Sequence, residues 1–205
     1  WTVEPRFDYA RGRTRIRTRA GIPVATSGAD AIAVVAFDAG ARTERPEENG
    51  MAHFLEHLVF KGGQKYDDYR KVNETAERMG GVLNAYTSHD LVAFHITCRA
   101  EVAEQAIDLL TDFVARAHLD GEELEKERGV VIQEINRSND QPSSVADKLL
   151  DRAVYGDHPL GRPVLGPEEH LKTFSRDTDP LIRDLQPVAR DLAPTLRDVR
   201  AFAPD

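Results

Sequence analysis

The chain has 205 residues, with 27 Lys and Arg against 35 Asp and Glu, and its formal net charge is −8. This acidic balance argues against a nucleic-acid or anionic-membrane partner held by bulk charge, because such binding needs basic residues that displace counterions from phosphates. With 40% hydrophobic and 30% charged residues, the composition is typical of a folded soluble protein and excludes collagen-like, low-complexity and membrane-spanning chains.

Residues 1–20 alternate weakly between polar and apolar positions, which predicts an exposed strand whose partner the sequence does not identify. Segments 21–26 and 31–37 predict two further strands. The second is almost wholly apolar and therefore central in a sheet. A connector rich in turn residues follows at 40–50.

The rest of the chain is mainly helical in pattern, with one pair of strands. The expected elements are a helix from Met51 to the stop at Gly62–Gly63, a helix at 67–79, strands at 82–87 and 91–99, helices at 101–116, 121–137 and 144–155, and a short helix from Pro167. From residue 177 an apolar seam recurs every seven residues, but Pro187 and Pro194 interrupt it. Residues 177–205 therefore predict an amphipathic helical tail kinked by proline.

The chain contains one cysteine, Cys98. An internal disulfide and an all-thiolate zinc site are therefore excluded, and a metal would need His and carboxylate ligands. Neither a leader segment nor an apolar stretch of about 20 residues is visible, so a cytoplasmic location is the default expectation.

The segment His53–His57 has the pattern H-x-x-E-H. On a helix its two histidines lie one turn apart, with Cβ atoms about 5–6 Å from each other, so both imidazoles can reach one ion. Glu56 falls on the same side of the helix. The opposite side carries the apolar residues Met51, Leu55 and Leu58. One face is thus suited to a metal and the other to a core.

A third ligand is needed, and Glu134 is a good candidate because it lies in the apolar run 130–135, where burial without a partner would be unfavourable. Glu127 lies seven residues earlier and nearly in line with it on the same helix face. Glu127 is less diagnostic, because the start of this helix is rich in charge. From these residues alone, a structural alternative stays open, in which the histidines of a buried helix are hydrogen-bonded to carboxylates.

The H-x-x-E-H pattern, with a Glu 77 positions after its last His, resembles the inverzincin zinc metallopeptidases, the family of pitrilysin, insulinase and the mitochondrial processing peptidase. Three other segments resemble motifs of that family. They are the turn Gly40–Glu44, the strand Gly81–Thr87 with its G-x-x-N-A-x-T pattern, and the loop Gly156–Gly161 with its H-P-L-G pattern. The resemblance covers residues 21–176, the family's N-terminal catalytic unit.

The resemblance implies an α+β fold, an antiparallel sheet with helices packed mainly on one face. It divides the chain into a strand of uncertain origin at 1–20, a zinc metallopeptidase-like domain at 21–176 and the helical tail at 177–205. Both ends depart from the family's pattern.

Carried over residue by residue, the resemblance implies that His53, His57 and Glu134 bind one zinc ion per chain and that Glu56 is the general base. Glu127 matches a second acidic position near the metal, where it would steer a ligand. Two imidazoles and one carboxylate leave a fourth zinc position for water, whose proton Glu56 would accept as it attacks a peptide carbonyl.

Asn84 and Ala85 match the edge strand beside which the family's substrate lies. The implied function is a zinc-dependent endopeptidase acting on a peptide or unfolded protein, together with a second similar domain or subunit. Two alternative hypotheses remain. In the first, the chain is a non-catalytic family member that serves as a structural or binding subunit. In the second, it is a nonfunctional composite.

Overall fold

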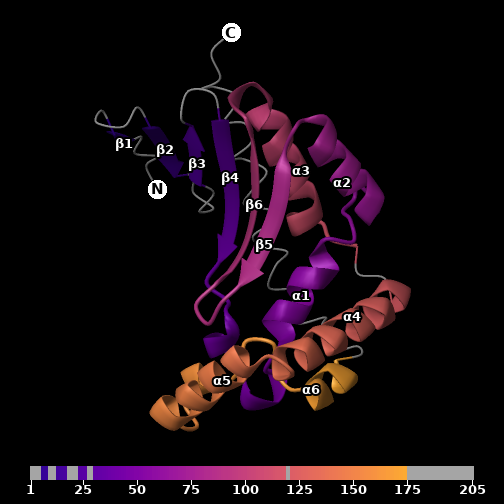
Figure 1. Cartoon of the computed structure of the whole chain (residues 1–205). Coiled ribbons are helices and arrows are strands. Elements are labelled where there is room, and N and C mark those ends of the chain that lie inside the picture. The colour runs from indigo at the N-terminus through magenta and orange to yellow at the C-terminus, as the bar shows by residue number, and fades with distance from the viewer. Residues whose placement is uncertain (1–5, 9–12, 18–22, 27–29, 119–120, 175–205) are drawn as a thin grey trace.

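The computed structural model describes residues 6–8, 13–17, 23–26, 30–118 and 121–174. Within them a six-stranded sheet carries helices on one face, and a second group of helices lies across one end of the sheet (Figure 1). The predicted proline-kinked tail lies outside the described residues.

The described strands pair antiparallel throughout, in the order β1-β2-β3-β4-β6-β5. Their bounds are Arg6–Asp8 (β1), Arg13–Arg17 (β2), Pro23–Thr26 (β3), Asp30–Phe37 (β4), Val82–Thr87 (β5) and Val92–Arg99 (β6). Residues 1–20 were expected to form one strand without an identified partner, and they contain two, β1 and β2, which pair with each other. The strand β2 also pairs with β3, from Arg17↔Pro23 to Thr14↔Thr26. The strand β5 is the outermost at the other side of the sheet, with Asn84 opposite His95 on β6.

The first hydrophobic cluster lies between one face of the sheet and the helices α2 (Tyr69–Arg78) and α3 (Ala103–Ala115). Alternate residues of β4 and β6 enter it, as expected of an antiparallel sheet with one covered face. Its members include Val35, Phe94, Ile96, Val72 and Phe113. On the other face of β4, Ile32 is 41% exposed. The prediction of helices packed mainly on one face of an antiparallel sheet is confirmed.

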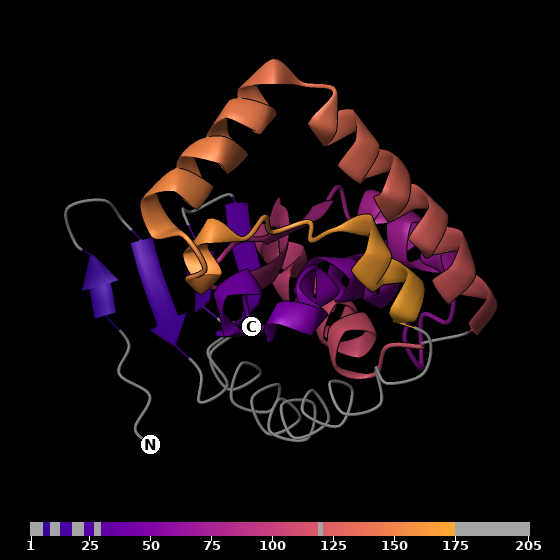
Figure 2. The same cartoon turned by 90° about the horizontal axis from the view of Figure 1, so that it is seen from below.

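The second hydrophobic cluster lies among α1 (Met51–Val59), α4 (Gly121–Asn139) and α6 (Glu168–Thr173). Its members include Phe54, Leu58, Val131, Ile135 and Phe174. The helix α5 (Pro142–Tyr155) buries no residue of its own, and Figure 2 shows it meeting α4 at an angle. None of the described helices combines the length and the apolar composition that a membrane crossing requires.

Candidate metal centre

The N-terminus of α1 is capped by a carboxylate from an earlier turn and not by the residue that directly precedes the helix. Gly50 precedes it with φ +100°, a conformation that suits glycine, and offers no side chain. The Glu44 carboxylate accepts hydrogen bonds from the backbone N–H groups of Gly50 (2.9 Å) and Ala52 (2.6 Å) instead. Burial nevertheless raises the pKa of Glu44 above its usual value. Glu44 ends the turn that the sequence analysis singled out.

Both hydrophobic clusters hold α1, one on each side. Leu55 and Val59 enter the sheet cluster, whereas Phe54 and Leu58 enter the cluster with α4 and α6. The sequence pattern predicted one apolar face, and the structure divides that face between two cores. A third side of the helix is left for the polar residues of the motif.

The structure brings together the two histidines of α1 and one carboxylate of α4. Glu134 Oε2 lies 3.6 Å from His53 Nε2 and 3.4 Å from His57 Nε2. One ligand atom from each of the three residues lies within 4.8 Å of the others. The spacing of the motif and the position of Glu134 are therefore compatible with three ligands to one ion.

The donor set fits zinc, because two imidazole nitrogens and one carboxylate oxygen are ligands that zinc accepts and leave one position open. Burial, followed by the nearby His57, lowers the pKa of His53 to about 4. His53 is therefore neutral near pH 7, as a metal ligand must be. Its buried Nδ1 atom has no hydrogen-bond partner in the described structure.

Glu56 lies beside these three residues and is not one of the clustered ligand groups. Its Oε2 atom accepts a hydrogen bond of 2.5 Å from the hydroxyl of Thr87, the last residue of β5. Burial is the main cause that raises the pKa of Glu56, and the Thr87 hydrogen bond opposes it. This carboxylate is thus held by the sheet, and the nearby charge of Glu134 adds to the rise in its pKa.

Glu127 contacts His57 at Nδ1, the ring nitrogen other than the one that lies near Glu134. Its Oε2 atom lies 3.1 Å from His57 Nδ1, and its Oε1 atom lies 2.5 Å from Lys61 Nζ. The side chain of Glu127 is 10% exposed and that of Glu134 is 44% exposed. The burial predicted for Glu134 was therefore wrong, since its side chain is half-exposed, whereas Glu127, for which the sequence was less diagnostic, is buried.

The sequence analysis missed two residues of this centre, Thr87 and Lys61. Thr87 ended a segment that matched a family motif, but its hydroxyl was given no role. Lys61 follows His57 by four residues, the same spacing that joins His53 to His57, and this spacing places a side chain on the same face of a helix. That spacing is the signal that would have found it.

Asn84 and Ala85 lie on β5, the edge strand of the described sheet. The Asn84 side chain accepts the Ala85 N–H at 2.9 Å through its Oδ1 atom. From these residues β5 runs on to Thr87 and so to the carboxylate of Glu56. Among the described residues, the outer edge of β5 carries no further strand, and it leads to the candidate metal centre.

Comparison with protein families gives a match over residues 24–168 to the family described as Insulinase (Peptidase family M16). Among curated proteins, the chain is 41% identical over 139 residues to the uncharacterized zinc protease YmxG of Bacillus subtilis, covering 68% of this chain and 34% of that protein. It is 37% identical over 139 residues to the mitochondrial-processing peptidase subunit beta of Saccharomyces cerevisiae, covering 68% of this chain and 30% of that protein. The chain spans about a third of the length of these relatives.

Solved structures show the same fold. A protease from Helicobacter pylori superposes with a TM-score of 0.73 and 22% identity, over 90% of this chain and 43% of that one. Pitrilysin superposes with a TM-score of 0.69 and 22% identity, over 92% of this chain and 20% of that one.

Proposed function

Because the chain belongs to the insulinase family of peptidases, family M16, we propose that it is a zinc-dependent endopeptidase with His53, His57 and Glu134 as the metal ligands. The observation that carries the proposal is the clustering of three ligand atoms within 4.8 Å, with Glu56 beside them as a carboxylate that is not needed as a ligand. When bound, zinc would polarise a peptide carbonyl and lower the pKa of a water molecule toward about 7.

Glu56 serves as the general base. One of its carboxylate oxygens accepts the Thr87 hydroxyl proton in a hydrogen bond, which fixes the orientation of the group. Its free lone pairs accept a proton from the attacking water, and the same group then gives that proton to the nitrogen of the leaving amine. His57 is oriented by Glu127, whose carboxylate accepts the Nδ1–H and so leaves Nε2 free for the metal.

The substrate lies along β5. A peptide that pairs with the free edge of this strand beside Asn84 and Ala85 is held by main-chain hydrogen bonds, so that its backbone keeps a fixed register. The strand ends at Thr87, next to Glu56, and the paired backbone is therefore led to the base. This mode of binding suits a peptide or an unfolded protein and not a folded surface.

Hydrolysis of an unfolded protein by the zinc-loaded chain tests the function. Glu56→Gln keeps the shape of the side chain and removes the base, and we expect it to retain zinc while the rate falls at least about 100-fold. Glu77→Gln on the exposed surface of α2 is the matched control. Equal hydrolysis rates for wild type and Glu56→Gln at equal zinc content would show that Glu56 is not the general base.

A further inference from the structure

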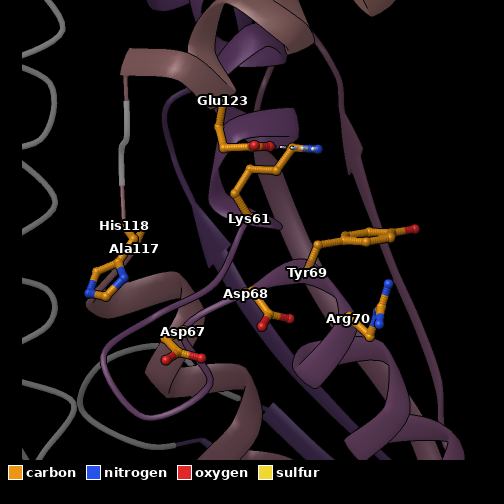
Figure 3. Close-up of a pocket in the computed structure, with 8 residues that line it drawn as sticks. All are labelled: Lys61, Asp67, Asp68, Tyr69, Arg70, Ala117, His118 and Glu123. Atoms are coloured by element: carbon orange, nitrogen blue, oxygen red, sulfur yellow. Dashed lines mark ion pairs between the residues drawn. The ribbon is translucent and has the colours of Figure 1, made fainter.

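Lys61 lies just beyond α1, at the point where the helix ends. Its backbone N–H bonds to the Leu58 carbonyl, and its side chain is only 17% exposed. The ammonium lies 2.5 Å from Glu127 Oε1, 3.9 Å from Glu123 Oε2 and 5.3 Å from the centre of the Tyr69 ring. Figure 3 shows the Lys61 side chain directed at Glu123, on the wall of a pocket of about 900 Å³.

The two oxygens of the Glu127 carboxylate have different partners. Oε1 contacts Lys61, whereas Oε2 contacts His57 Nδ1 at 3.1 Å. A carboxylate on a glutamate rotates easily about its last bond, because that torsion is broad. A cation that holds one oxygen therefore fixes where the other oxygen points. Charge-assisted contacts of this kind are the stronger class of hydrogen bond.

The direction of Glu127 matters because a carboxylate can only accept a hydrogen bond, so the contact requires a proton on His57 Nδ1. The proton on Nδ1 leaves the lone pair on Nε2, which is the atom 3.4 Å from Glu134. His53 lacks such a partner within the described structure, since its buried Nδ1 is unpaired. Of the two histidines, His57 is therefore the one whose Nδ1 atom is held by a carboxylate in the described structure.

We propose that Lys61 is a positioning residue for the metal centre: it holds Glu127 so that Glu127 holds His57 with Nε2 directed at the metal position. The proposal rests on the proposed function for the metal itself. Lys61 touches neither a metal ligand nor the substrate edge, and it acts through Glu127 alone. Glu123 lies 1.4 Å farther from the ammonium than Glu127 does (3.9 against 2.5 Å), which makes Glu127 the partner that fixes Lys61.

The test compares Lys61→Met with a matched control on the same loop, Lys65→Met. Lys65 also pairs with an acid, Asp108 at 2.5 Å, and also lies over a tyrosine ring, Tyr66 at 5.0 Å. It has no contact with Glu127 or with either histidine. Both substitutions keep most of the aliphatic stem and remove one charge. They differ in the acid they release and in burial, since the Lys61 side chain is 17% exposed and the Lys65 side chain is 58% exposed.

Two measurements on the full chain are required. Zinc affinity, obtained by competition with a chromophoric chelator, should fall about 10-fold in Lys61→Met, the usual scale for removing a partner behind a metal ligand. Lys65→Met should match wild type, and Lys61→Arg should restore most of the loss. In the zinc-free chain, ¹⁵N NMR of the imidazoles should show His57 protonated on Nδ1 in wild type and shifted toward the Nε2–H form in Lys61→Met.

If Lys61→Met and Lys65→Met have the same zinc affinity and the same His57 tautomer, the proposal is wrong. Should Lys61→Met fail to fold, Lys61→Gln takes its place in both measurements. A wild-type chain that binds no zinc would overturn the proposed function, yet the tautomer comparison on the zinc-free chain would still decide the role of Lys61. The two failures are thus distinct.

Discussion

The Thr87 hydroxyl donates a 2.5 Å hydrogen bond to Glu56 Oε2, and this contact joins the last residue of the edge strand β5 to the carboxylate beside the candidate ligands. The strand along which a peptide is proposed to lie and the base proposed to act on it are therefore in direct contact.

Thr87→Val should lower peptide turnover about 10-fold, because a hydrogen bond to a charged group is worth about 1.5–3 kcal/mol and the carboxylate of Glu56 loses its fixed orientation. Zinc content should not change, since Thr87 contacts none of the three ligands. Thr75→Val, which removes a hydroxyl bonded to the Lys71 carbonyl on α2, is the control. Turnover of Thr87→Val at the wild-type rate would mean that the contact has no part in orienting the base.

Zinc binding should depend on the three clustered residues His53, His57 and Glu134. We expect about one zinc per chain, and Glu134→Gln should weaken binding by about 10-fold or more because a charged ligand becomes a poor neutral one. Metal analysis after dialysis against a weak chelator measures this, with Glu77→Gln as the control. Identical zinc content in wild type and in the double variant His53→Ala/His57→Ala would remove the basis for a metal centre.

The free energy of unfolding of the zinc-free chain should depend on pH in a way that reflects the burial of His53. Its pKa is about 4 when folded against 6.5 as its ordinary value, so the unfolded chain binds the proton more tightly. The contribution of His53 to stability is therefore complete above pH 6.5 and is lost progressively as the pH falls toward 4. Denaturant unfolding across this pH range gives the free energies of unfolding of wild type and His53→Ala. The difference between these two free energies should become smaller at low pH. A constant difference would indicate that the imidazole titrates in its ordinary range.

A glycine comparison tests how tightly the loop after α1 is packed. A Cβ on Gly63 would lie 2.5 Å from the Asp112 side chain and 2.6 Å from its carbonyl oxygen, whereas a Cβ on Gly129 meets nothing within 4 Å. Asp112 is fully buried and accepts the N–H groups of Lys65 and Tyr66. Gly63→Ala should destabilise the chain by about 1–3 kcal/mol. Gly129→Ala, inside α4, should stabilise it by up to about 1 kcal/mol; equal effects would contradict the packing shown by the structure.

Activity of the chain alone should be low. A peptide held only along β5 is supported on one side, and a misplacement of about 1 Å can reduce a rate 100-fold. We therefore expect useful turnover to need a second copy or a second, similar unit. Turnover per zinc across a dilution series, measured together with the mass in solution, gives the answer. Full turnover by a monomer, independent of concentration, would show that one unit suffices.

Local patterns in the sequence were sufficient to predict most of the helices and strands. The strand at 82–87 was predicted with the bounds that the structure has, and the helix expected at 67–79 is α2, which begins after Asp68, a residue that accepts the Lys71 N–H as a cap. The helix expected from Ser144 begins two residues earlier at Pro142, because proline is well suited to the first turn.

The candidate site was less fully predictable, for a physical reason. Helical spacing placed His53, Glu56 and His57 on one side of α1, since that relationship is local. Which acid on α4 is buried depends on what packs against it, and the pairing of Glu127 with Lys61 joins segments 66 residues apart. No periodicity within one helix reports such a contact. The division of the apolar face of α1 between two clusters also depends on contacts with distant segments, so the local pattern of the helix could not predict it.

The candidate ligands come from two helices, α1 and α4, which pack together across the second hydrophobic cluster. An ion held by both helices would be bound by the folded chain and released on unfolding, so the free energy of unfolding should rise with the logarithm of free zinc. At a zinc concentration about 100 times the dissociation constant, the gain would be about 2.7 kcal/mol. A chelator and a rise in temperature would then act on one and the same equilibrium.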